Sequence, residues 1–164
     1  MGALKLATAD QHARLERRVD IESRVRSRDA YRHLLERFYG FYRPLEAVLE
    51  PFAVVEPKLG FLAADIAELG GGVDGLPLAT RVPVVRSLRD ALGVGYVLEG
   101  STLGGAVIAR LVRSELGLTP RFFGVYGRDV ARRWRAFGAV VEAHGAESSA
   151  AVACFEDLEA WVCA

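Results

Sequence analysis

The sequence predicts an all-α fold, and three observations support this prediction. Apolar residues recur at three- and four-residue intervals along nearly the whole chain of 164 residues, which is the period of amphipathic helices. The two short runs that could form strands, residues 82–85 and 94–98, are not flanked by an alternating hairpin pattern. Glycines at residues 70–72, 117 and 145 stand where helical runs stop. We therefore expect six to eight helices in a single domain over residues 1–164.

The predicted helices share the same apolar period, and a turn or a loop separates each from the next. They cover residues 4–19, 31–49, 61–69, 84–91, 93–116, 130–141 and 152–162. Pro44 lies inside the second run, where it is expected to kink the helix. Three glycines from Gly70 end the third run, and the stretch to Pro83 is predicted to be a loop. Gly117 and Gly145 end two later helices.

The composition excludes several classes of protein. Lys plus Arg is 21 and Asp plus Glu is 21, so the formal charge is zero and a general nucleic-acid binder is not expected. Hydrophobic residues make up 51% of the chain and charged residues 26%, which excludes a disordered chain. No run of about 18 apolar residues indicates a membrane span. The N-terminus also lacks a secretory leader, so a cytoplasmic location is expected.

The two cysteines indicate neither a disulfide nor a zinc site. Cys154 and Cys163 are nine residues apart in one predicted helix. This places them about 13 Å apart along the axis, too far for a disulfide. Neither belongs to a CxxC pair or lies beside a histidine.

The glycine content of residues 93–116 is unusual for a helix. Five glycines fall within 13 residues: Gly93, Gly95, Gly100, Gly104 and Gly105. Each costs roughly 0.8–1 kcal/mol against alanine in a helix interior. One explanation is close packing of helices, with Gly100 and Gly104 on a single face. The other is a flat ligand lying against bare backbone, which only glycine permits.

Two nucleotide-binding motifs are excluded in the same region. Gly95, Gly100, Ser101 and Thr102 have part of the spacing of a phosphate-binding loop. The lysine that would precede Ser101 is missing, and no strand clearly precedes the segment. The sequence also lacks a GxGxxG motif with the acidic residue of a dinucleotide site.

His12 is the candidate metal ligand. It follows Leu4 by eight residues, on the apolar side of the first helix, where a histidine satisfied within the core is the simplest interpretation. Glu16 is one turn further, where its carboxylate could accept a hydrogen bond from Nδ1 and leave Nε2 free for a metal. Lys5 lies two turns before His12, on a similar face. His33 and His144 lie among polar neighbours and are expected at the surface.

A di-iron carboxylate site is a rival interpretation of the metal-binding pattern. Such sites in helical bundles need repeated Glu-x-x-His pairs. The chain contains none, so this alternative is set aside.

Two segments resemble the haem oxygenase family. Residues 4–16, LKLATADQHARLE, resemble the proximal helix of these enzymes, and residues 96–105, YVLEGSTLGG, resemble their distal helix. The second segment is most similar to the bacterial branch that supplies biliverdin to bacteriophytochromes. The two segments stand about 90 residues apart, and the resemblance covers most of the chain. It implies a haem-oxygenase-like helical bundle with a kinked, glycine-rich distal helix.

On the proximal side, the resemblance implies a role for three residues. His12 would be the axial ligand of the haem iron. Glu16 would orient its imidazole through the second ring nitrogen, and Lys5 would pair with a haem propionate.

On the distal side, Gly100 and Gly104 would bring bare backbone onto the haem face, with Gly105 supporting the kink. Ser101 stands where part of the family has an aspartate that organises distal water, so Ser101 and Thr102 would have to serve instead. The tyrosine that often assists near the start of this helix corresponds to Tyr96.

Arginines supply nearly all the positive charge. Arg128, Arg132 and Arg135 lie opposite the apolar stripe of their predicted helix. They form a solvated face, pair with propionates, or dock an acidic electron donor. The resemblance places Arg128 nearest a propionate-binding position.

The resemblance implies an enzyme that cleaves haem to biliverdin, carbon monoxide and ferrous iron. Haem would be both substrate and cofactor, and dioxygen and an external electron donor, ferredoxin-like or a flavin reductase, would be required. A bacteriophytochrome is a possible client for the product. A carrier of the same fold that binds haem without degrading it is the main alternative, and a helical interaction domain is a third.

Overall fold

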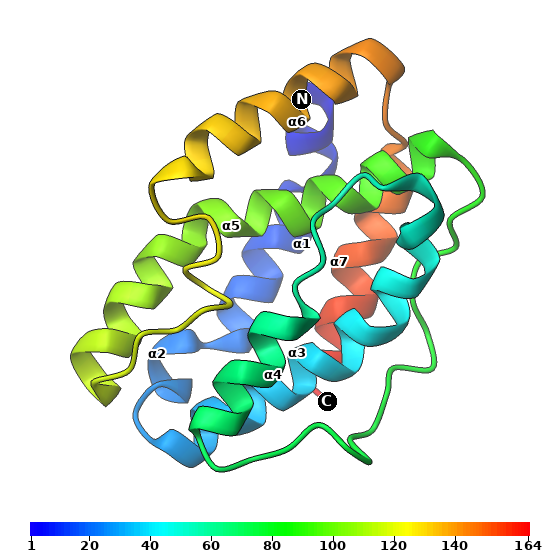
Figure 1. Ribbon diagram of the computed structural model, residues 1–164. Helices are drawn as coiled ribbons and strands as arrows, with labels where there is room; N and C mark the ends of the chain where they lie inside the picture. The colour runs from blue at the N-terminus through cyan, green and yellow to red at the C-terminus, as the bar shows by residue number, and fades with distance from the viewer.

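The computed structural model describes all 164 residues and contains helices and loops but no strand, which confirms the predicted all-α class (Figure 1). The α-helices are α1 (Gly2–Val19), α2 (Ile21–Arg24), α3 (Arg28–Leu49), α4 (Leu59–Glu68), α5 (Leu88–Leu116), α6 (Val130–His144) and α7 (Ser148–Val162). There are two 3₁₀ turns: η1 (Glu50–Phe52) follows α3 directly, and η2 (Gly127–Asp129) directly precedes α6. Pro44 lies inside α3, which continues to Leu49.

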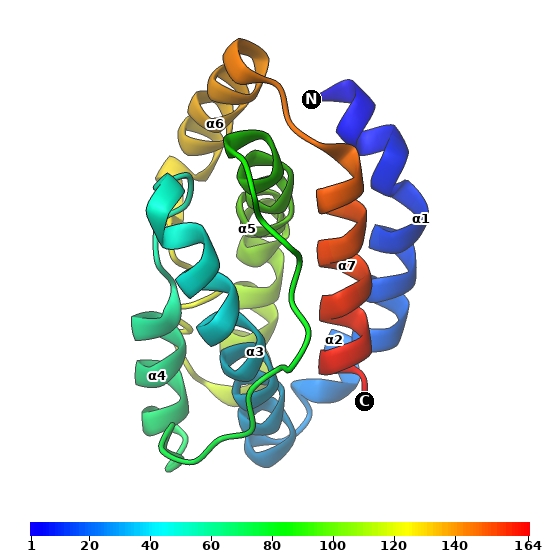
Figure 2. The ribbon, with the colours of Figure 1, turned by 90° about the vertical axis from the view of Figure 1, so that its right-hand side faces the viewer.

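The C-terminal helix α7 is the element on which the others assemble. α1, α3 and α5 all pack against it, α4 packs on α3, and α6 packs on α5. Figure 2 shows α1 and α7 side by side. One connected cluster of 28 buried residues forms the hydrophobic core.

The long helix α5 differs from the prediction at its start. Residues 84–87 are loop, so the separate short helix expected over residues 84–91 is wrong. The reason is a cap at Ser87, whose hydroxyl accepts from the Asp90 amide at 3.1 Å, while the Asp90 carboxylate accepts from the Arg86 amide at 3.0 Å. This arrangement satisfies backbone donors and starts a single helix that runs to Leu116. Figure 1 shows α5 changing direction along its length.

The short helix α2 was not expected from the apolar period. Asp20 adopts a left-handed conformation with φ 46°, and this ends α1. Its carboxylate then accepts from the Ser23 amide at 3.4 Å. One residue therefore both ends one helix and caps the next.

The helix α5 is long and apolar enough to cross a membrane by length and composition, contrary to the expectation that no such stretch exists. However, 56% of its most apolar window is buried inside the bundle. This burial is typical of the core helix of a folded bundle, which needs apolar residues on most of its faces.

Ion pairs at the side of α1 fix this helix on α7. Arg14 Nε lies 2.6 Å from Glu159 Oε2, and Arg18 Nη1 lies 2.8 Å from Glu159 Oε1. The Glu159 side chain is only 6% exposed. The hydrogen bonds from Arg18 and Arg14 hold the pKa of the Glu159 carboxyl below its ordinary value.

We predict that Glu159→Gln weakens the acid sensitivity of the fold. A carboxyl whose pKa is lowered by folding stabilises the protein above its unfolded pKa of about 4.3. This stability is lost as the pH falls through the lower pKa of the folded state. The variant should have a lower Tm at pH 7 and a shallower fall of Tm between about pH 5 and pH 3. Glu156→Gln, at an exposed position of the same helix, is the control. An unchanged slope for the Glu159 variant would contradict the assignment.

Candidate functional site

The three residues predicted for the proximal side lie along one flank of α1. Lys5, His12 and Glu16 are spaced by seven and four residues, which places them on neighbouring turns of the same side. The buried face of this helix carries Leu4 and Thr8. Lys5, His12 and Glu16 are exposed. The structure therefore groups them at the edge of the core, where they can meet a ligand.

The His12 ring is held on one side only. It packs edge-on against Phe155 of α7, with 5.7 Å between the ring centroids. Its Nδ1 lies 3.7 Å from Glu16 Oε2, and 55% of the His12 side chain is exposed. A histidine satisfied within the core would be buried, so that interpretation is wrong. His33 and His144 are exposed as expected.

The glycines of α5 fall into two groups with different physical reasons. A Cβ added at Gly93 would lie 2.2 Å from Glu147 O, at Gly95 it would lie 3.1 Å from the Phe137 ring, and at Gly105 it would lie 2.5 Å from Phe123 O. These three glycines allow close approach of other segments. The packing explanation therefore holds for them.

Gly100 and Gly104 are explained differently. A Cβ added at Gly104 would have no atom within 4 Å, and one added at Gly100 would meet only the Trp134 ring at 3.4 Å, an ordinary contact. Packing within the protein does not require glycine at either position. These two residues lie one turn apart and expose bare backbone on one side of α5, which is the cradle that a flat ligand needs. We call residues 100–104 the bare turn.

The hydroxyls of the bare turn bond to the helix itself. Ser101 Oγ donates to Leu98 O at 2.8 Å, and Thr102 Oγ1 donates to Glu99 O at 2.6 Å. Bonds of this kind bend helices slightly. Burial raises the pKa of the Tyr42 phenol, and a hydrogen-bonding contact with Ser101 opposes that shift. Ser101 thus lies beside a buried phenol of α3, a neighbour that the sequence pattern did not identify.

The remaining predicted residues lie at the border of this region or away from it. Tyr96 is half-buried and packs on Trp134, with 5.6 Å between the ring centroids. Because Trp134 also covers Gly100, the two aromatic rings form one border of the bare turn. Arg128 lies in η2 and is exposed.

A buried polar cluster beneath the bare turn was missed by sequence reasoning. Lys58 Nζ lies 2.7 Å from Glu99 Oε1, and both side chains are at least 90% buried. Tyr126 donates from its hydroxyl to the same oxygen at 3.1 Å. The sequence carried a signal for this pair, because Glu99 follows eight uncharged residues and Lys58 is one of only two lysines.

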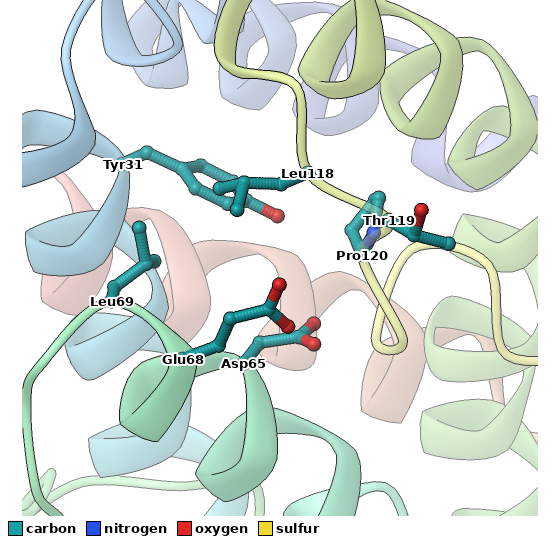
Figure 3. A pocket seen from close by; sticks show the side chains of 7 residues that line it. All are labelled: Tyr31, Asp65, Glu68, Leu69, Leu118, Thr119 and Pro120. Carbon is teal, nitrogen blue, oxygen red and sulfur yellow. The ribbon is translucent and has the colours of Figure 1, made fainter.

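Two hollows of the surface contain none of the predicted residues. The first is small and lies between α3, α4 and the loop after α5. Figure 3 shows the Tyr31 hydroxyl near the carboxylates of Asp65 and Glu68 there. The Tyr31 hydroxyl is buried without a hydrogen-bond partner. The second lies around Arg43, Glu46 and Pro57. Neither is a candidate for the chemistry predicted at His12.

Helices α1 and α5 carry the two parts of the candidate site. Both pack on α7, and they have little contact with one another. An imidazole therefore stands uncovered on one helix while bare backbone stands uncovered on the other. The residues present thus fit a flat, iron-containing ligand with acidic side groups, for which His12 supplies a nitrogen donor and Lys5 a positive charge.

We predict that alanine substitutions at the adjacent residues Gly104 and Gly105 change the free energy of unfolding in opposite directions. Gly104→Ala should raise the free energy of unfolding by about 0.5–1 kcal/mol, because alanine is the better helix former and the space is open. Gly105→Ala should lower it by about 1–3 kcal/mol, because the new methyl group collides with the Phe123 carbonyl. Urea unfolding of the ligand-free protein measures both. A loss of stability in the Gly104 variant would show that this glycine is structural.

Comparisons with known proteins identify the family of the chain. The family model described as "Heme oxygenase" matches residues 1–60, which include all of α1 and α3. A curated relative named "Heme oxygenase", from Xanthomonas campestris pv. campestris (strain 8004), is 33% identical over 125 residues. The match covers 70% of this chain and 73% of the relative. The chain therefore belongs to the haem oxygenase family.

Proposed function

We propose that the protein is a haem oxygenase that uses dioxygen and electrons from an external donor to convert haem to biliverdin, carbon monoxide and ferrous iron. The observation that carries this proposal is the bare turn, where a Cβ added at Gly104 would meet no atom within 4 Å. It stands on α5, which packs on α7, as does α1, the helix that carries the exposed His12. Family membership by sequence supports the same conclusion.

On the proximal side, we assign His12 as the axial ligand. A neutral imidazole binds iron through Nε2 when its Nδ1 proton is held by an acceptor. Glu16 is the proposed acceptor, since its Oε2 lies 3.7 Å from Nδ1 on the next turn of the same helix and would form this hydrogen bond on closer approach. Lys5, exposed on the same flank, would pair with a propionate. Arg128 is a second candidate for a propionate through its planar guanidinium.

On the distal side, the bare turn has no side chain at its two glycines, so the substrate would lie close to the backbone. When bound, haem supplies the iron at which dioxygen is reduced, and its own ring is the site of oxidation. Gly100 and Gly104 place backbone on that face and add no acidic or basic side chain there. Gly105 keeps the helix against the Phe123 carbonyl, and Ser101 and Thr102 offer hydroxyls for ordered water. Tyr96 stands at the border.

The electron donor, the client and the location are parts of the same proposal. Arg132 and Arg135 are exposed on α6, and an acidic ferredoxin-like protein or flavin reductase would dock through complementary charge. A bacteriophytochrome is the proposed client for biliverdin, and the cytoplasm is the proposed location. A haem carrier of the same fold is the second candidate function, because Ser101 replaces the expected aspartate.

The first test separates the enzyme from the carrier. Haem is added to the purified protein, followed by ascorbate or reduced ferredoxin in air, and the Soret band is followed. Loss of this band with growth of a biliverdin spectrum is expected. A stable Soret band would favour the carrier, and absence of binding would overturn both.

We predict that His12→Ala abolishes turnover and shifts or weakens the Soret band, because the iron loses its axial nitrogen. The ligand-free variant should fold normally, since the His12 side chain is more than half exposed. His33→Ala, at another exposed histidine of the chain, is the control and should behave as wild type. Full activity of the His12 variant would show that the axial assignment is wrong.

We also predict that Gly104→Leu lowers haem affinity by at least about tenfold, because a branched side chain fills the space against which the ring lies. Titration of haem, followed by the Soret band, measures this change. Gly60→Leu is a matched control, since Gly60 lies in α4 and a Cβ added there also meets open space. Equal affinities in the two variants would remove Gly104 from the site.

A further inference from the structure

Five residues close a ring of polar contacts beside α5. Lys58 Nζ lies 2.7 Å from Glu99 Oε1, which also accepts from the Tyr126 hydroxyl at 3.1 Å. The Tyr126 ring lies 4.4 Å from the Arg133 guanidinium carbon. Arg133 Nη1 lies 3.5 Å from Glu56 Oε1, and Lys58 Nζ donates to Glu56 O at 3.1 Å. We call these residues the Lys58–Glu99 ring.

The ring joins three segments to α5 where the bare turn begins. Lys58 is the residue before α4, and Tyr126 stands just before η2. Arg133 belongs to α6 and is followed by Trp134, which covers Gly100. Glu99 immediately precedes Gly100. The ring therefore connects the support of the bare turn to the helix that borders it.

Glu99 does not itself face the proposed ligand. It is five residues before Gly104, which corresponds to about 140° around the helix. Its Oε1 already accepts from two donors. The geometry therefore argues against a role of Glu99 in proton transfer to the ligand. Its contacts act on the backbone that follows it.

The burial of this pair is not explained by stability alone. Both side chains are at least 90% buried, and removing two charges from water costs several kcal/mol per ion. Apolar residues of similar size often give equal or greater stability at such positions. A buried ion pair differs from an apolar contact in that its hydrogen bonds fix distance and direction.

The bare turn needs such a constraint. Because residues 100 and 104 are glycines, no side chain there fixes the distance of the turn from a ligand or its orientation about the helix axis. Its position is fixed by the contact of Gly105 with the Phe123 carbonyl, by Glu99 and by the Trp134 ring beside Gly100. A misplacement of about 1 Å at a reacting centre can change a rate about 100-fold.

We propose that Lys58 and Glu99 are positioning residues that set the place of the bare turn and thereby decide which edge of the haem ring is oxidised. This inference rests on the proposed function. Tyr126 contributes through its single hydrogen bond to Glu99, and Arg133 transmits the constraint to α6.

The experiment compares three variants with the wild-type protein. Lys58→Met with Glu99→Leu replaces the ion pair by apolar side chains of similar size and leaves no buried charge. Tyr126→Phe removes the hydrogen bond to Glu99 and keeps the aromatic side chain next to the Arg133 guanidinium. Arg89→Met is the control, because it removes another ion pair of α5, the exposed pair with Glu147 at 2.8 Å at the start of the helix.

Three properties are measured: thermal stability, amide hydrogen exchange of residues 99–105 in the haem-free protein, and the isomer ratio of the linear tetrapyrrole product. We expect the double variant to keep a Tm near that of wild type. Its residues 99–105 should exchange at least about tenfold faster, and its product should become a mixture of isomers. Tyr126→Phe should change the exchange and the isomer ratio in the same direction, but less. Arg89→Met should change neither.

The outcomes distinguish this inference from the proposed function. If the double variant folds with wild-type exchange and a wild-type isomer ratio, the pair is structural only and the inference is overturned. If the double variant does not fold, Tyr126→Phe decides by the same two measurements. If the wild-type protein binds no haem, the proposed function fails, and the control over the reacting edge fails with it. The exchange rates then still show whether the pair positions the turn.

Discussion

A helix that exposes bare backbone to a ligand has to be held entirely from its other sides. This constraint explains the arrangement around α5, the longest helix of the bundle. Gly93 accommodates the carbonyl of Glu147, Gly95 accommodates the Phe137 ring, and Gly105 accommodates the carbonyl of Phe123. These close contacts bring α6, α7 and the loop after α5 against one helix. Gly104 is then free to remain uncovered, and Gly100 is bordered only by the Trp134 ring.

The cost of such a turn is met by the rest of the core. Glycine in a helix interior is unfavourable by roughly 0.5–1 kcal/mol relative to alanine, and the bare turn gains nothing from packing at Gly104. Binding sites commonly carry local choices of this kind, which a more stable sequence would avoid. The pairing of α1 with α7 through Glu159 places the other side of the candidate site on the same central helix.

Sequence patterns predicted much of the fold, for identifiable reasons. Long amphipathic helices such as α3 and α6 were predicted because one face of each is continuously apolar. The start of α5 was misplaced because capping by Ser87 and Asp90 outweighs a weak apolar period before it. The four-residue helix α2 is too short to have a period and depends on the left-handed conformation of Asp20.

The candidate site was predicted less completely, because some of its contacts join distant segments. His12 and Glu16 lie one helical turn apart, so their proximity follows from the sequence. The contact of Lys58 with Glu99 joins residues 41 positions apart and depends on where the segment before α4 lies against α5. The distinction between packing glycines and uncovered glycines likewise requires the positions of Phe123 and Glu147. Neither is encoded in local spacing.

The burial of Lys58 has a practical consequence for the chemistry of the surface. The chain has only two lysines, and burial of one of them leaves Lys5 as the sole side-chain amine open to solvent. A reagent that acylates primary amines would therefore attach a reporter at Lys5 or at the N-terminus, both on α1 or at its start. Lys5, two turns from His12, is therefore a nearly unique attachment point in this arginine-rich protein.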